Sequence, residues 1–80
     1  MVSFEKAYAI VKRKIEGKEA ISCIETKNHF VFNMTPTVAD SKAYIVHKGL
    51  GIYREVYFEK IAREPIIRQI DIRIVERKQN

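Results

Sequence analysis

Tyrosines and basic residues in the second half of the chain form a pattern typical of a binding surface. Aromatic rings on a sheet, with basic side chains beside them, can stack nucleic-acid bases and neutralise phosphates. Each stacked base contributes about 1–3 kcal/mol in such sites. Tyrosine is also a common strand former whose ring simply covers a sheet, and Glu55 would repel phosphate. The candidate partner or nucleic-acid surface comprises Tyr44, Tyr53, Tyr57, Lys42, Lys48 and Arg54.

Residues with catalytic potential do not form a recognisable set in the sequence. His29 and His47 are the only histidines, and each is expected near a hairpin end, where they meet only if the two ends converge. Cys23 is the only cysteine, which excludes a disulfide framework and favours a small buried side chain. The serines have no evident base, and Gly49 and Gly51 lie in an expected hairpin, so they do not open a phosphate-binding helix. We therefore expect a non-enzymatic protein with no metal and no cofactor.

The elements that would position these residues begin with a helix over about residues 3–16. Ser3 is a plausible N-cap, and apolar residues then recur at spacings of three and four. Gly17 stands where a left-handed residue would end the helix. The basic triplet 12–14 falls in the last turns, where cations meet the negative end of the helix dipole. That position explains the triplet without any binding role.

Period-two alternation predicts strands over about 20–26, 29–34, 43–48 and 51–58. Pairing Thr26 with His29 sets Cys23 opposite Phe32, and would set Ile21 opposite Met34. In the second half, Gly49-Leu50 suits a two-residue turn with positive φ at Gly49. That turn pairs Lys48 with Gly51 and Val46 with Tyr53. The predicted result is two hairpins joined by residues 35–42.

The C-terminal third fits two interpretations. Pro65 could begin a helix that carries the following isoleucines, because proline is favoured at the first helical position. Alternation of Ile70, Ile72 and Ile74 with polar residues instead favours a strand. We expect an irregular or helical turn over 65–69, then a strand over 70–76.

Length and composition limit the function classes. The chain has 80 residues, enough for one small domain, with 15 basic and 10 acidic residues and a net charge of +5. The charges are interspersed, so the positive balance permits an anionic partner without indicating one. No apolar run approaches the roughly 20 residues of a membrane span, so we expect a cytoplasmic protein with no membrane partner.

The elements together predict an α+β fold, with one N-terminal helix packed on an antiparallel sheet of four to five strands built from two hairpins. One helix covers only one sheet face, so the tyrosine-bearing face or an edge strand would need a covering partner. The expected function is a small binding or regulatory protein that acts through a sheet face or edge, with a protein partner or as a homodimer. A single-stranded nucleic-acid-binding module is the alternative.

Overall fold

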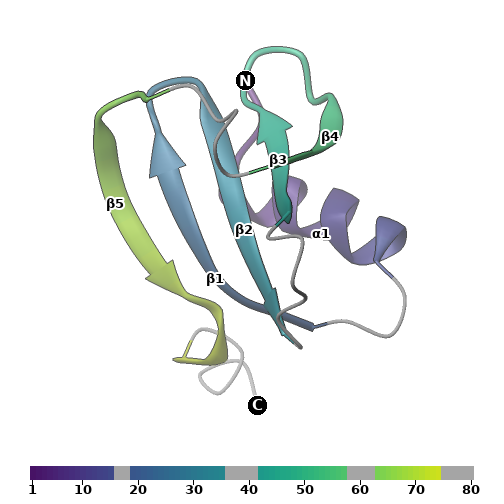
Figure 1. The fold of residues 1–80 in the computed structure, drawn as a ribbon. Coiled ribbons are helices and arrows are strands. Elements are labelled where there is room, and N and C mark those ends of the chain that lie inside the picture. Colours follow the sequence, from purple (N-terminus) through teal and green to yellow (C-terminus); the bar gives the residue numbers. More distant parts are fainter. Residues whose placement is uncertain (16–18, 36–41, 58–62, 75–80) are drawn as a thin grey trace.

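A computed structural model describes residues 1–15, 19–35, 42–57 and 63–74. It shows an N-terminal helix and one five-stranded antiparallel sheet, which is the predicted α+β fold (Figure 1). The strands lie in the order β4-β3-β2-β1-β5, so β4 and β5 form the two edges. Because β2 pairs with β3 as well as with β1, the strands form one continuous sheet. The elements are α1 (Phe4–Lys14), β1 (Glu19–Thr26), β2 (His29–Thr35), β3 (Lys42–His47), β4 (Tyr53–Tyr57) and β5 (Ile66–Asp71).

Helix α1 begins at the predicted cap. The Ser3 side chain accepts a hydrogen bond from the Lys6 backbone N–H, which satisfies a donor that has no partner within the helix. The helix ends at Lys14, and Ile15 is already extended while its N–H still donates to the Val11 carbonyl. The predicted end at Gly17 lies outside the described residues.

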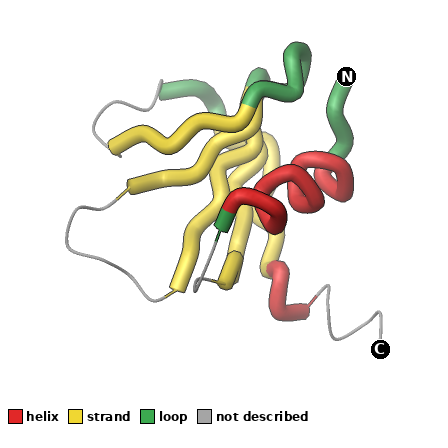
Figure 2. Tube along the Cα trace, turned by 90° about the vertical axis from the view of Figure 1, so that its right-hand side faces the viewer, coloured by secondary structure: helices red, strands yellow, loops and turns green. Residues whose placement is uncertain are grey.

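The helix covers one face of the sheet, and the main core lies between these two layers (Figure 2). Phe4, Ala7 and Val11 are the buried residues of α1, at the predicted helical spacing. The Phe4 ring lies near both Phe30 and Phe32 of β2, with centroids about 6 Å apart. Burial of these apolar side chains is the main force that holds the helix on the sheet. The fully buried core side chains also include Cys23, Val46 and Ile72.

The β1–β2 register follows the prediction at Cys23, which lies opposite Phe32. It departs from the prediction at Ile21, because a register shift places Ala20 opposite Met34 and Ser22 opposite Asn33. Ile21 is therefore the extra residue of a bulge, and the expected Ile21–Met34 pair is wrong. The small Ala20 takes the core position instead, at 3% exposure.

The connection between β3 and β4 keeps the predicted register but not the predicted turn. Val46 lies opposite Tyr53, as expected. Gly51, not Gly49, has the positive φ, at 68°. The Gly51 N–H donates to the His47 carbonyl at 2.8 Å, and the His47 N–H donates to the Ile52 carbonyl at 3.0 Å. The loop is thus longer than a two-residue turn, and residues 51 and 52 do not extend β4.

The structure reverses the predicted order of the C-terminal elements. Residues 66–71 form strand β5, which pairs antiparallel with β1, and residues 72–74 are helical. Asp71 explains the change, because its side chain accepts hydrogen bonds from the backbone N–H groups of Arg73 and Ile74, as an N-cap does. The helical turn then directs Ile72 into the core at 1% exposure. The part of the predicted strand beyond residue 74 lies outside the described residues.

The sheet face away from α1 has a small core of its own. Val31, Ala43 and Ile45 are buried there, and Ile24 and Val56 pack against them. Within the described parts of the chain, no helix is long and apolar enough to cross a bilayer.

Candidate interaction surface

The three predicted tyrosines lie on the sheet side that α1 covers, so they do not form the exposed face that we expected. Tyr44 belongs to the main core at 4% exposure and has no accessible ring face to offer a base. The Tyr53 ring stacks near Tyr44, with centroids 6.5 Å apart, and packs against the same core. Burial raises the pKa of the Tyr53 phenol, and the neighbouring Glu55 carboxylate adds to this rise. Tyr57 alone of the three is exposed, at 46%.

The basic residues of the predicted set are also divided between different sites. The Lys42 ammonium lies over the Tyr57 ring, 5.9 Å from its centroid. Lys48 is buried at 6% exposure and is bound to a carboxylate, so it is not available to a phosphate. Arg54 lies opposite Ile45, which belongs to the core on the face away from the helix. The six residues therefore do not form one continuous surface.

Glu25 is the carboxylate that binds Lys48, and it also accepts a hydrogen bond from Arg68 of β5. Hydrogen bonds from Lys48 and then from Arg68 hold the pKa of the Glu25 carboxyl below its usual value. The Lys48 ammonium also lies 5.1 Å from the centre of the Phe30 ring, a cation–π contact. These contacts join β1, β5 and the start of the β3–β4 loop. The sequence did not predict this pairing, because Glu25 and Lys48 are 23 residues apart and belong to different predicted hairpins. The one signal was Glu25, a charged residue on the same predicted strand face as Cys23.

Glu64 is a second connecting carboxylate, and sequence reasoning did not identify it. Its oxygens accept hydrogen bonds from Thr26 Oγ1 at 2.7 Å, Asn28 Nδ2 at 2.6 Å and His29 Nδ1 at 2.9 Å. The hydrogen bond from His29, followed by that from Thr26, lowers the pKa of Glu64 to about 2. Because Glu64 is far from these residues in sequence, no local pattern could reveal the contact. The carboxylate holds the chain entering β5 against the β1–β2 turn.

The two histidines are brought together by the β2–β3 pairing. His29 lies opposite His47, and their rings meet edge to face with centroids 5.0 Å apart. We expected such a pair only if the two hairpin ends converged, and the sheet makes them converge. The described residues contain no group of three or more histidine, cysteine, aspartate or glutamate side chains placed to hold a metal ion.

Cys23 is buried in the main core, as its isolation in the sequence suggested. Burial raises the pKa of its thiol to about 12, and the Glu25 charge contributes to this rise. A thiol with so high a pKa is almost entirely protonated near neutral pH and is a poor nucleophile. Cys23 is therefore a packing residue.

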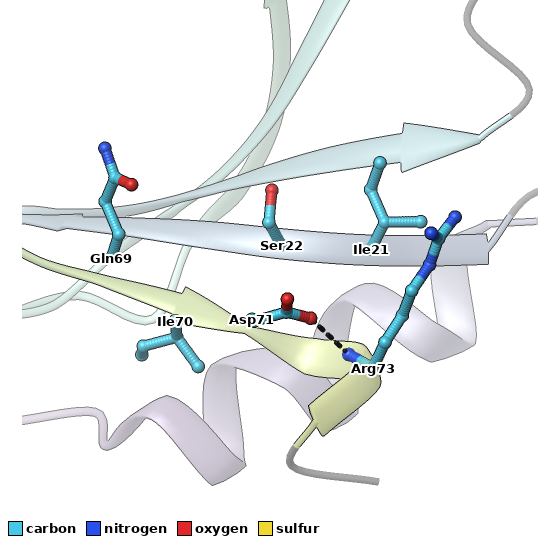
Figure 3. A pocket seen from close by; sticks show the side chains of 6 residues that line it. All are labelled: Ile21, Ser22, Gln69, Ile70, Asp71 and Arg73. Carbon is cyan, nitrogen blue, oxygen red and sulfur yellow. Dashed lines mark hydrogen bonds between the residues drawn. The ribbon is translucent and has the colours of Figure 1, made fainter. Parts of the chain in front are cut away.

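Strand β5 is the most exposed apolar element among the described residues of the sheet. Among the described strands it pairs only with β1, and five of its six residues are exposed, Ile70 being the exception. Ile66 and Ile67 are 58% and 60% exposed. Figure 3 shows the hollow beside this strand, in which Gln69, Ser22 and Ile21 point to one side and Ile70 points to the opposite side.

Comparison with known proteins identifies no relative: no family model, no curated protein and no solved structure matches this chain.

Proposed function

We propose that this chain is a small, non-enzymatic binding or regulatory protein of the cytoplasm that associates with a second copy through strand β5. The observation that carries the proposal is the pair of adjacent exposed isoleucines, Ile66 and Ile67, on an edge strand. A strand at a sheet edge presents unpaired backbone N–H and C=O groups, and apolar side chains on it favour pairing with another strand.

The opposite edge is less suited to the same contact. Strand β4 has the sequence YREVY, in which Arg54 and Glu55 are both exposed charges. Charged side chains on an edge oppose pairing with a second sheet. Strand β5 carries two charged residues, Arg68 and Asp71. The Arg68 guanidinium already donates to Glu25, and the Asp71 carboxylate accepts hydrogen bonds from the backbone of Arg73 and Ile74, which leaves less free charge at that edge. The asymmetry favours β5 as the contact strand.

The sheet geometry limits the register of such a pair. When a two-fold axis normal to the sheet relates two antiparallel edge strands, each residue lies opposite a residue of the other copy whose side chain is on the same face. The axis must therefore pass between the two copies of one residue, which then lies opposite itself. Centring on Arg68 would set two guanidinium groups opposite each other, whereas centring on Gln69 sets two neutral amides opposite each other and Ile67 opposite Asp71. We propose the Gln69-centred register.

Sedimentation velocity from about 1 to 200 μM tests the association. A contact limited to one strand pair is expected to be weak, with a dissociation constant in the micromolar range on the order of 10 μM. Ile67→Glu should return the protein to a monomer, because the Gln69-centred register sets it opposite Asp71 of the other copy, a like charge. Ile52→Glu, the same change at a half-exposed site in the β3–β4 loop, should leave the dimer intact. A wild-type monomer at every concentration would refute the association, and loss of the dimer in Ile52→Glu but not in Ile67→Glu would refute the contact strand.

Cysteine cross-linking tests the register. Gln69→Cys places two thiols opposite each other across the axis, so mild oxidation should produce a disulfide-linked dimer. Ile67→Cys is the matched control, because its proposed neighbour is Asp71 of the other copy. Native Cys23 is buried and should not interfere. Equal cross-linking of the two variants would contradict the Gln69-centred register.

Binding of single-stranded nucleic acid is the second proposal. The observation that favours it is the exposed Tyr57 ring with the Lys42 ammonium above it. Affinity for an oligothymidine at about 50 mM salt should then fall steeply as salt increases, and Tyr57→Ala should weaken it. Absence of binding at that salt concentration would exclude this function.

A further inference from the structure

The hollow at the histidine end of the sheet is separate from the β5 edge. It has a volume of about 330 Å³, and it is lined by His29, Ile45, His47, Leu50, Ile52 and Arg54. These residues come from β2, β3, β4 and the β3–β4 loop. The geometry points to a binding site for a small organic carboxylate that has a short apolar chain.

The hydrogen bonds around His47 determine what its ring can offer. The backbone N–H groups of Gly49 and Leu50 both donate to His47 Nδ1, each at 3.1 Å. Nδ1 is therefore an acceptor without a proton, and the neutral ring carries its proton on Nε2. His47 is consequently a hydrogen-bond donor toward a ligand. It is poorly suited to metal binding, because a metal on Nε2 would require the proton to move to Nδ1 and both backbone hydrogen bonds to break.

The cationic side of the hollow is Arg54. Arg54 is exposed, and its guanidinium makes no ion pair with a carboxylate among the described residues. Among the described residues, the carboxylate that contacts a histidine of this hollow is Glu64, and its oxygens are already bound to Thr26, Asn28 and His29. A carboxylate ligand suits the planar guanidinium, which can donate two parallel hydrogen bonds to it.

The remaining lining residues are apolar and accessible. Leu50 is 70% exposed and Ile52 is 50% exposed, while Ile45 forms a buried part of the wall. Such side chains favour an aliphatic group and add nothing to the binding of an inorganic anion. The combination of one guanidinium, one fixed N–H donor and an aliphatic wall therefore selects an amphiphilic carboxylate.

Titration of the ¹⁵N-labelled protein with hexanoate tests this site. Hexanoate should shift the backbone amides of Gly49 and Leu50 and the Nε signal of Arg54. Hexanol lacks the charge, and acetate and inorganic phosphate lack the chain, so each should bind at least about fivefold more weakly. An absent response to hexanoate would overturn the proposal. A response to hexanol equal to that with hexanoate would show an apolar site only. An equal response to phosphate would show an anion site only. Either result would overturn the proposal.

Two matched variants assign the response to Arg54. Arg54→Gln should weaken hexanoate binding about fivefold, while Arg73→Gln, the same charge change at the hollow of Figure 3, should leave it unchanged. Both side chains are exposed, so both variants should retain the native circular dichroism spectrum. Equal weakening by the two variants would show a nonspecific charge effect and would overturn the assignment. Perturbation of the His47 ring by Zn²⁺ at micromolar concentration would show a metal site and would also overturn it.

Discussion

Glu64 Oε1 lies 2.9 Å from His29 Nδ1, and this contact joins the residue before Pro65 to the first residue of β2. The same carboxylate accepts hydrogen bonds from Thr26 and Asn28. The chain is thereby held at the β1–β2 turn directly before it enters β5. Since β5 is an edge strand with few buried side chains, this anchor is important for its placement.

Replacement of Glu64 should loosen β5 before the rest of the sheet. Glu64→Gln removes the charge that strengthens the hydrogen bonds from His29, Thr26 and Asn28, so the free energy of unfolding should fall by about 1–2 kcal/mol. Urea denaturation measures the loss, and amide hydrogen exchange should show faster exchange in Ile66–Asp71. Glu55→Gln is the control, because Glu55 is exposed and accepts only a 3.3 Å hydrogen bond from Tyr53. Equal losses in the two variants would contradict an anchoring role.

Stability should depend on pH through the same carboxyl group. The pKa of Glu64 is about 2 in the folded protein, against 4.5 for an ordinary glutamate. As pH falls, the unfolded chain takes up this proton first, so the stabilisation from Glu64 is complete above pH 4.5 and is lost between 4.5 and about 2. The urea midpoint should therefore decrease over that range. In Glu64→Gln the urea midpoint should fall less steeply with decreasing pH than in the wild type. An equally steep fall would assign the acid sensitivity to other carboxyl groups such as Glu25.

Removing one partner of the Glu25–Lys48 pair should lower the free energy of unfolding more than replacing both partners with apolar residues. Lys48→Met leaves Glu25 with Arg68 as its remaining partner, and we expect a loss of about 2–3 kcal/mol, below that of a fully buried pair. The double variant Glu25→Leu/Lys48→Met removes both charges and should recover most of the loss. Thermal and urea unfolding measure this cycle. Lys42→Met, at a half-buried lysine, is the control and should change stability by less than about 0.5 kcal/mol.

Gly51 should be sensitive to a side chain because of its backbone conformation. Because Gly51 has a φ of 68°, Gly51→Ala should lower the free energy of unfolding by about 1 kcal/mol. The new alanine Cβ would also lie 3.3 Å from Val2 Cγ2. Gly51→Asn should cost less, because asparagine tolerates the left-handed region. Differential scanning calorimetry distinguishes the two variants. Equal stability of Gly51→Ala and the wild type would mean that the loop adopts another conformation in solution.

The central strands could be predicted because their side chains alternate strongly and short connections fix their partners. Cys23 opposite Phe32 and Val46 opposite Tyr53 both follow from that alternation. The bulge at Ile21 could not be predicted in this way, because Ile21 and Ala20 are both acceptable core residues by type. Packing selected the smaller side chain for the core.

The order of the C-terminal elements depended on contacts outside the segment. Isoleucines at 66, 67, 70, 72 and 74 satisfy both strand and helix patterns. The Glu64 anchor and the pairing with β1 place the strand first, and the Asp71 cap then begins a helical turn. Asp71 is the last residue of β5, and the hydrogen bonds that its side chain accepts from the backbone of Arg73 and Ile74 end the strand there.

Local alternation and helical spacing in the sequence were sufficient for the α+β class, for helix α1 with its Ser3 cap and for the pairing of neighbouring strands. These features depend on residues close together in the chain, whose periodicity can be read directly. Only the tertiary structure decided that the tyrosine-bearing side of β3 and β4 is the one that faces the helix, that Tyr44 is buried, and that His29 meets His47. Those outcomes depend on contacts between distant segments, where competing packings of similar side chains leave no local pattern to distinguish them.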